Sequence, residues 1–455
     1  MEVETTDAWA LSANLSFTVD EGFAITGISA NAKNLLGTGT QVGIFRNAWR
    51  ERLRLGVLGR QPNLFGTRID ATIHGGETRS ATYLDQSLFR PFAGELGSNA
   101  FRQRYARRDD YFSYSVDPTT GITQTLLRFE AEGWEATYQR RFGNPEGLRF
   151  VAGFGVSHES IRFPFGDEGV RVVREDAFDD PEPAPREAID AVSIHANEHQ
   201  MTRLNFTLGV RDLRFLNLVG LDALEASQDV ESGLGLGITV APGTESGGDA
   251  IDDVLFRGQA RLGFRFGDVY LNFDADAQAR NVFTDPDQGP TGWRDILYEL
   301  NGNGYWDHGG RGQVFGRAQL AGASRVDRPF QLTLGGRESI RGYNEDAYPG
   351  RQRLILTLEE RLEMPELSTS FADVGIVAFA DAGQIWAGDV PFGETPGWTA
   401  AVGAGLRLGL PAGAPNVLRV DVALPLTGDR ETRGTVFRVY AELLGLLDRR
   451  AWPTQ

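Results

Sequence analysis

The stretch that decides the fold is Thr202-Arg203-Leu204-Asn205-Phe206-Thr207-Leu208-Gly209-Val210-Arg211. Successive side chains of a β-strand point to opposite faces, so an extended backbone separates the apolar residues of this run from its charged and polar residues. One face carries Thr202, Leu204, Phe206, Leu208 and Val210, and the other carries Arg203, Asn205, Thr207, Gly209 and Arg211. The run is therefore predicted to be a strand with one apolar and one polar face.

The same alternation recurs near the end of the chain. In Val402–Leu410 the single charged residue, Arg407, lies opposite the apolar face, and in Leu418–Leu424 Arg419 and Asp421 do so. A soluble β-sandwich also alternates, with its apolar face turned inward, so periodicity alone leaves a sandwich and a membrane barrel open.

Three features favour a barrel in a membrane. Alternating segments are joined by alternately short and long connections, aromatic residues gather near the expected strand ends, and charge falls on the polar face of nearly every run. The short turns are Asn34–Gly39, Gln61–Gly66, Gly143–Gly147, Met364–Leu367 and Pro411–Asn416; the long loops are Phe163–Gln200, Phe283–Gly292 and Asp327–Gly350; the aromatics are Trp49, Phe65, Phe142, Trp293, Trp386 and Trp398.

Composition narrows the class further. The chain has 455 residues with 56 glycines and 3 methionines, which favours strands and turns over helices. A net charge of -17 argues against a nucleic-acid partner, and the absence of cysteine excludes a disulfide framework and a thiolate metal site. No apolar run reaches the roughly 18 residues of a membrane helix, and Met1–Glu4 lacks the features of a signal peptide.

Counting the alternating segments gives about 16 to 20 strands, beginning near Trp9–Thr18 and ending near Gly434–Ala441. In residues 101–138 and 254–310, long strands cannot be distinguished from extra hairpins. We expect one transmembrane β-barrel over residues 9–443, a periplasmic stub over residues 1–8 and a periplasmic tail over residues 444–455. No second domain is predicted.

Two motifs carry a resemblance to a known family. The first is Leu334-Gly335-Gly336-Arg337-Glu338-Ser339-Ile340-Arg341-Gly342-Tyr343, and the second is Phe379-Ala380-Asp381-Ala382-Gly383, with Glu359-Glu360-Arg361 between them. In this order they resemble the BamA-, TamA- and FhaC-like superfamily of outer-membrane insertion and secretion barrels, the bacterial surface antigen barrels.

The resemblance implies a fold and a site. The fold is all-β, a transmembrane antiparallel up-and-down barrel, and because family barrels have 16 strands we expect 16, with 20 as the upper limit. The sixth external loop folds inward, so that Ile340, Arg341, Gly342 and Tyr343 meet the inner wall. The expected wall residues are Phe379, Asp381 and Gly383, with Glu359 and Arg361 on the neighbouring strand. An arginine fork suits a carboxylate, and glycine permits a close approach.

The resemblance also implies a function at the outer membrane of a Gram-negative bacterium. The barrel would insert or translocate proteins, or lipids, through a lateral seam between its first and last strands. The expected seam residues are Trp9 and Phe17 on one side and Gly434, Phe437 and Val439 on the other. The partners would be membrane lipids and unfolded outer-membrane or secreted proteins, with no cofactor and no enzymatic chemistry.

Two departures keep other functions open. Family members usually carry periplasmic POTRA modules, whereas only about eight residues precede the first expected strand. The chain also runs on to Gln455 instead of stopping on an aromatic residue. A passive pore or structural barrel, and the membrane domain of a larger chain whose periplasmic modules were removed, are therefore alternatives.

One further motif could hold a metal. His195-Ala196-Asn197-Glu198-His199 fits the H-x-x-E-H pattern, in which two imidazoles one helical turn apart bind zinc. Nothing around it predicts the required helix or a third ligand. His195 and His199 are thus a weak candidate, and no metal site is predicted.

Overall fold

The computed structural model describes residues 11–18, 24–35, 37–49, 52–92, 97–116, 120–144, 147–166, 169–175, 177–245, 250–283, 291–336, 339–414, 417–428 and 437–442. The predicted stub at residues 1–8 and the predicted tail at residues 444–455 lie outside the described residues, as do Trp9 and Gly434 of the predicted seam.

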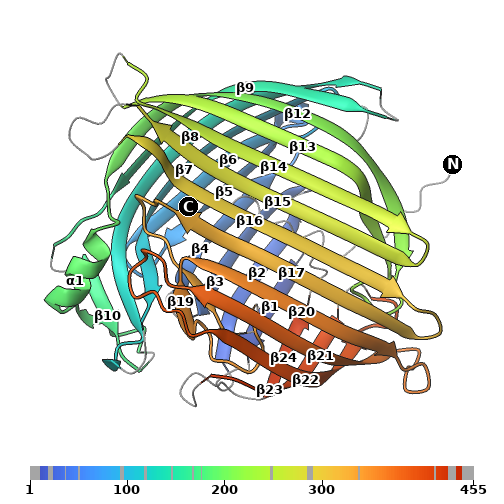
Figure 1. Ribbon diagram of the computed structural model, residues 1–455. Helices are drawn as coiled ribbons and strands as arrows, with labels where there is room; N and C mark the ends of the chain where they lie inside the picture. Colours follow the sequence, from blue (N-terminus) through green and yellow to red (C-terminus); the bar gives the residue numbers. More distant parts are fainter. Residues whose placement is uncertain are drawn as a thin grey trace.

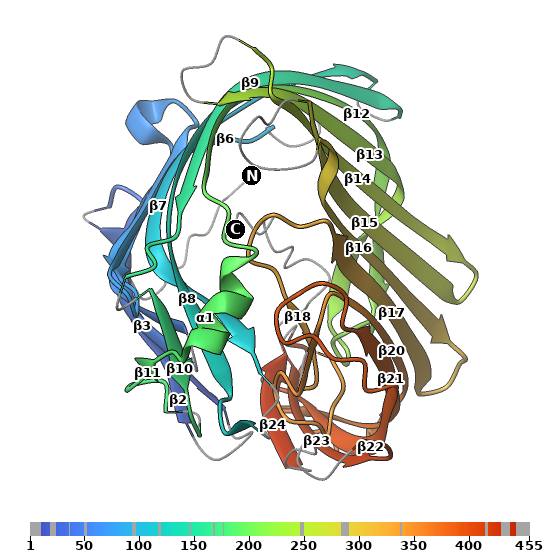
Figure 2. The same cartoon turned by 60° about the vertical axis from the view of Figure 1, so that its left-hand side comes forward.

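Twenty described strands form a meander in which each is antiparallel to the next. They are β1 (Leu11–Thr18), β2 (Ala24–Leu35), β3 (Thr40–Trp49), β4 (Arg52–Gln61), β5 (Asp70–Glu77), β6 (Thr82–Arg90), β7 (Asn99–Ser115), β8 (Gln124–Gly143), β9 (Arg149–Arg162), β12 (His199–Val219), β13 (Ser227–Glu245), β14 (Asp253–Phe266), β15 (Val269–Val282), β16 (Gly292–Asp307), β17 (Gly312–Ser324), β20 (Gln352–Glu363), β21 (Asp373–Trp386), β22 (Trp398–Gly409), β23 (Val417–Pro425) and β24 (Phe437–Glu442). Figure 1 shows them side by side, and Figure 2 shows the sheet curling around.

Four short strands lie in the connections. β10 (Val170–Val173) pairs with β8 and with β11 (Glu182–Pro183), while β18 (Leu332–Leu334) and β19 (Tyr348–Gly350) form a separate two-stranded sheet. A one-turn 3-10 helix, η1 (Leu64–Gly66), lies in the turn between β4 and β5.

The expectation of 16 strands is wrong, and the upper limit of 20 fits the described chain. Residues 101–138 belong to one long hairpin of β7 and β8, and residues 254–310 hold β14, β15 and β16. Counting the alternating segments gives about 16 to 20 strands, and the choice of 16 within that range came from the family resemblance. Those long strands do not account for the difference, because the meander itself has four more strands.

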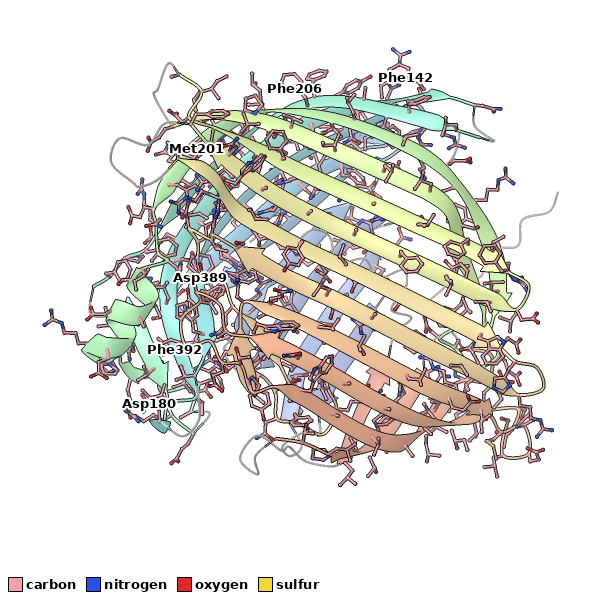
Figure 3. All side chains as sticks on the ribbon, viewed as in Figure 1. Phe142, Asp180, Met201, Phe206, Asp389 and Phe392 are labelled. Carbon is pink, nitrogen blue, oxygen red and sulfur yellow. The ribbon has the colours of Figure 1, made fainter. Side chains whose placement is uncertain are left out.

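The two faces of the sheet have the polarity that the alternation predicts. On β12, Leu208 is 62% exposed, whereas Arg203, on the opposite face of the same strand, is 4% exposed. Phe206 and Phe142 project from the outer surface in Figure 3. Exposed apolar side chains outside and buried charges inside reverse the arrangement of a soluble protein and suit a wall surrounded by lipid.

Short and long connections lie at opposite ends of the sheet. All five predicted short turns fall at one end, where Asn34, Gly37 and Gly39 adopt positive φ angles of 61°, 74° and 75° in the first turn. Glycine and asparagine tolerate this left-handed conformation, so the turn can be tight. The three predicted long loops fall at the other end, on the left in Figure 1.

The one described α-helix, α1 (Arg186–Ser193), lies in the long connection between β9 and β12. Pro185 precedes its first turn, Glu187 complements its N-terminal dipole, and Ala188 and Val192 are buried one turn apart. Val192 packs in a cluster with Tyr114 and Phe163, so the helix packs against the C-terminal end of β7. Within the described residues, no helix is long and apolar enough to cross a membrane.

Candidate functional site

The connection from β17 to β20, residues 325–351, turns into the curled sheet, and we call it the inward loop. Figure 2 shows its strand β18 inside the ring of strands. It is the eighth connection at the long-loop end, so the expectation of a sixth loop is wrong. In a 16-stranded meander five strands follow the sixth loop, and five follow here, β20 to β24. The four additional strands therefore precede the loop.

Arg341 lies at the tip of the inward loop and contacts the wall. Its side chain is buried, and its Nε and Nη2 atoms donate hydrogen bonds to the two oxygens of Asp381 at 2.7 and 2.8 Å. Its Nη1 atom donates to Glu359 at 2.8 Å and to Asp421 at 3.3 Å. One guanidinium thus joins three strands, β20, β21 and β23, through paired, charge-assisted hydrogen bonds.

The tip approaches the wall closely because the wall is aromatic and glycine-lined there. The guanidinium carbon of Arg341 lies 3.5 Å from the ring centre of Phe379, a cation–π contact. A Cβ atom at Gly383 would lie 2.5 Å from Cδ1 of Ile340, and Gly342 has a φ of +87°. Larger residues at either glycine would push the loop away from the strand.

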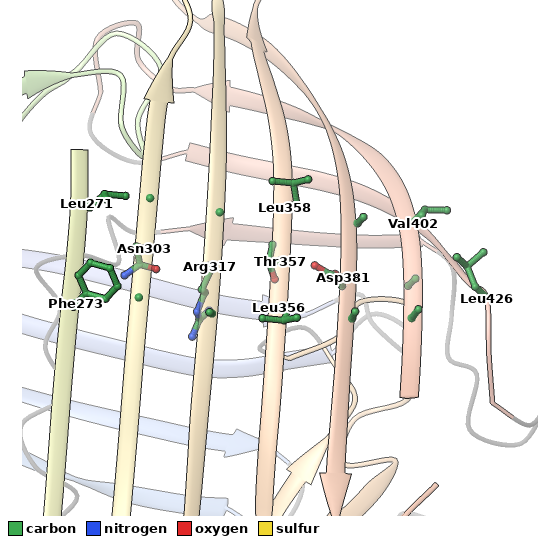
Figure 4. A pocket seen from close by; sticks show the side chains of 18 residues that line it. Leu271, Phe273, Asn303, Arg317, Leu356, Thr357, Leu358, Asp381, Val402 and Leu426 are labelled. Atoms are coloured by element: carbon green, nitrogen blue, oxygen red, sulfur yellow. The ribbon is translucent and has the colours of Figure 1, made fainter. Parts of the chain in front are cut away.

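Glu359 is the centre of the charge cluster. Its carboxylate accepts hydrogen bonds from Arg341 and Arg361 at 2.8 Å and from Arg419 at 3.0 Å. Arg419 also donates to Asp421 at 3.1 Å. Figure 4 shows Asp381 beside Thr357, its direct partner on the neighbouring strand β20. Three arginines thus face three carboxylates, which we call the arginine–carboxylate cluster.

The charge of Arg341 is maintained by this cluster. Burial lowers the pKa of its guanidinium, but the hydrogen bond to Asp381 and the charges of Asp381 and Glu359 outweigh that effect and raise the pKa above its ordinary value. A cation surrounded by hydrogen-bonded carboxylates remains charged at every physiological pH.

The structure brings together every predicted loop and wall residue. Ile340 and Tyr343 are buried with Leu334, Tyr348 and Ile355 in one apolar cluster beside the charges. The Tyr343 hydroxyl lies 2.9 Å from the carbonyl oxygen of Ala400 and 2.8 Å from that of Thr427. This side chain therefore connects the inward loop to β22 and to the segment that follows β23.

Tyr343→Phe is expected to lower the free energy of unfolding by about 1 kcal/mol, because the two carbonyls lose a shared donor while the packing of the ring is kept. Urea titration in lipid vesicles would measure the change. Tyr298→Phe, on the lipid-facing side of β16, is the matched control. Equal stability of the two variants would show that the Tyr343 hydroxyl contributes nothing.

The base of the inward loop is fixed by a second set of charges. Asp327 accepts hydrogen bonds from Arg280 at 2.8 Å and from Arg294 at 2.6 Å. The next residue, Arg328, donates to Glu159 on β9 at 2.8 Å. The loop is thus held to the wall at its base as well as at its tip, which limits the positions that the tip can adopt.

Four charged residues of the site were not singled out from the sequence. Arg419 and Asp421 belong to the cluster, and Asp222 and Arg407 adjoin it, since Arg361 contacts Asp222 at 3.4 Å and Arg407 donates to the main-chain oxygen of Asp222. The alternation had already placed Arg407, Arg419 and Asp421 on the polar face of their strands. Asp222 lies in a turn, where no alternation could indicate the direction of its side chain.

The histidines of the H-x-x-E-H motif do not form a metal site. Helix α1 ends at Ser193 and β12 begins at His199, so the two imidazoles are not presented from one helical turn. Nδ1 of His195 lies 3.1 Å from the carbonyl oxygen of Val326, and Nε2 of His199 lies 3.5 Å from Glu159. Across the described ranges, no three metal-ligating side chains are grouped.

The predicted seam is only partly within the described residues. Phe17 lies in β1, and Phe437 and Val439 lie in β24, while their side chains fall outside what the structure describes. Among the described residues, β1 pairs with β2 and β24 pairs with β23, and no ladder joins β1 to β24.

Comparison with known proteins adds a family. Residues 306–441 match the model of the Omp85 superfamily domain, a range that contains the inward loop and all six residues of the arginine–carboxylate cluster. No curated protein sequence matches the chain.

The solved structures that the chain matches include BamA from Haemophilus ducreyi lacking POTRA domains 1-3, with a TM-score of 0.48 and 14% identity over 95% of this chain and 75% of that one. CdiB from Escherichia coli gives 0.45 and 12% over 96% and 63%, and CdiB from Acinetobacter baumannii gives 0.38 and 10% over 95% and 65%. Residues 306–441 of this chain, which hold the inward loop and the arginine–carboxylate cluster, thus match an Omp85 superfamily domain.

Proposed function

We propose that this barrel inserts or translocates proteins at the outer membrane through a lateral seam between β1 and β24. The observation that carries the proposal is the set of ion pairs made by Arg341. Through Glu359, Asp381 and Asp421 it connects three of the four strands before β24, namely β20, β21 and β23, to the inward loop. These ion pairs brace the wall up to β23, the strand that precedes the seam strand β24.

The position of β24 at the end of the meander supports the same function. Within the described residues, β24 pairs with β23 through Val417–Val422 and with no other strand. The edge of a terminal strand can template an incoming strand. Clients would be unfolded outer-membrane or secreted proteins, and lipids would surround the apolar outer face.

A disulfide lock across the seam tests this function. The chain has no cysteine, so an introduced pair is unique. One member is placed in turn at positions Leu11–Leu15 of β1 and the other at Phe437–Ala441 of β24, and the pair that oxidises completely is used. Oxidation is expected to abolish insertion of a small unfolded outer-membrane β-barrel into proteoliposomes, and reduction is expected to restore it.

The matched control locks a ladder that is not the seam. Val402 and Leu424 are direct partners on β22 and β23, and a disulfide between cysteines at these positions should leave insertion unchanged. Full insertion by the oxidised seam variant would refute the lateral mechanism. If insertion also fails in the unlocked parent while planar bilayers record a steady conductance, the passive pore is the correct function.

A further inference from the structure

The hairpin of β12 and β13 is longer than the strands beside it. β12 pairs with β9 only as far as Arg211, and β13 pairs with β14 only from Gly233 onward, whereas β12 and β13 pair with each other out to Val219 and Ser227. Residues 212–232 therefore form a two-stranded ribbon at the short-turn end, which we call the free ribbon. In Figure 1 this green hairpin extends toward the right-hand end.

The free ribbon packs against the inner side of the wall. Its side chains Leu218 and Val230 are buried in one cluster with Tyr270, Tyr305 and Phe315 of β15, β16 and β17. The bend lies at Gly233, which has a φ of +123° and where a Cβ atom would lie 2.0 Å from the main-chain oxygen of Asp212. Only glycine fits there, so the sequence builds the bend into the hairpin.

The tip of the ribbon, residues 220–226, meets a set of hydrogen-bond donors on the wall. Gln313 donates to the carbonyl of Gly220 at 2.9 Å, and Arg361 donates to the carbonyl of Leu221 at 2.7 Å. Arg407 donates to the carbonyl of Asp222. The wall supplies donors and the tip supplies main-chain acceptors, so these contacts recognise the shape of a turn and not its side chains.

One carboxylate adds specificity to these contacts. The Asp222 side chain accepts hydrogen bonds from the hydroxyl of Tyr305 at 2.9 and 3.1 Å and from Arg361 at 3.4 Å. Leu224 is 3% exposed and lies where Gly375 has no side chain, since a Cβ atom there would be 2.6 Å from Leu224 Cδ2. The wall thus accepts an acidic residue and, two positions later, an apolar one.

A two-stranded hairpin without lateral neighbours is marginally stable by itself. The outer side of the free ribbon is exposed, with Val219 at 62%, so the packed inner side and the tip contacts hold it in place. A segment held this way can exchange with another that offers the same groups, namely free main-chain carbonyls at a turn and one carboxylate.

We propose that Gln313, Arg361, Arg407 and Tyr305 form a binding site for an acidic β-turn on the inner wall, which we call the turn-binding site. The tip of the free ribbon occupies this site in the structure, and an incoming client hairpin with an acidic turn would compete for it. This competition rests on the proposed function, whereas the turn-binding site itself can be tested without any transport.

The test separates the ribbon from its site. In the variant, an Asn-Gly turn replaces residues 214–232 and joins Leu213 to Gly233, which are direct partners. Folding is checked by heat-modifiable migration and circular dichroism. A fluorescent peptide of residues 212–232 is expected to bind the shortened barrel, to bind the parent far more weakly, and to lose most affinity when it carries Asp222→Asn. A peptide with Asp229→Asn, changed on the exposed side, should bind like the original.

A second measurement serves if the shortened barrel does not fold. In the full chain, Leu221→Cys is buried at the tip and Val219→Cys is exposed beside it. Adding the peptide should accelerate maleimide labelling of Leu221→Cys several-fold and leave that of Val219→Cys unchanged, and the Asp222→Asn peptide should have no effect. If the peptide neither binds the shortened barrel nor accelerates labelling of Leu221→Cys, the proposed turn-binding site is wrong. The disulfide lock across the seam tests the proposed function separately.

Discussion

Arg341→Ala is expected to lower the free energy of unfolding by about 3–5 kcal/mol, because it removes the cation that neutralises buried carboxylates. Asp381 is 2% exposed and would lose both hydrogen bonds of its paired contact. Glu359 keeps Arg361 and Arg419, so most of the loss should come from Asp381. Urea titration in vesicles, followed by the fluorescence of the eight tryptophans, measures the change.

The matched control is Arg351→Ala at the long-loop end. Arg351 contacts Asp389 at 3.0 Å, with both side chains partly exposed, and such surface pairs contribute at most about 1 kcal/mol. The double variant Arg341→Ala/Asp381→Asn should lose less than the sum of the single losses, since the stranded charge is removed with its partner. A loss at Arg341 no larger than the control would mean that the cluster does not stabilise the barrel.

Leu208→Arg is expected to cost about 2–4 kcal/mol in vesicles, because it places a cation on the lipid-facing side of the wall. Leu208 is 62% exposed on the outer face of β12, where a soluble protein would tolerate a charge readily. The same substitution therefore distinguishes a surface in lipid from a surface in water. The measurement is again the free energy of unfolding, determined at constant lipid composition.

The neighbouring residue provides the control for this second prediction. Thr207 points to the polar interior, where its hydroxyl lies 3.0 Å from that of Thr239. Thr207→Arg should lose about 1 kcal/mol for that hydrogen bond. If both variants lost the same amount, the outer face of β12 would not be in contact with hydrocarbon.

The faces of the wall were predictable from the sequence because a strand has a fixed period of two. The runs at Thr202–Arg211, Val402–Leu410 and Leu418–Leu424 all have their apolar residues outward, as predicted. The contact between Arg341 and Asp381 was expected only from the family resemblance, since residues 40 positions apart in the chain have no local pattern that pairs them.

Two features could not be read from the sequence. The strand number was not readable because a turn with few polar residues does not visibly interrupt a long alternating segment. Val219–Ser227 is such a turn, and it joins the two strands of a hairpin. The inward position of Asp222 depends on a bend at Gly233, which lies eleven residues later in the chain and is not marked by the alternation. Tertiary packing decides both.

The arginine–carboxylate cluster also orders the assembly of the barrel. Arg341 and Asp421 are 80 residues apart, and a contact of that separation forms only after the intervening chain has been arranged. Until β23 has paired, the Arg341 guanidinium lacks Asp421, one of its three carboxylate partners. The complete set of contacts around Arg341 therefore requires that the penultimate strand is in place.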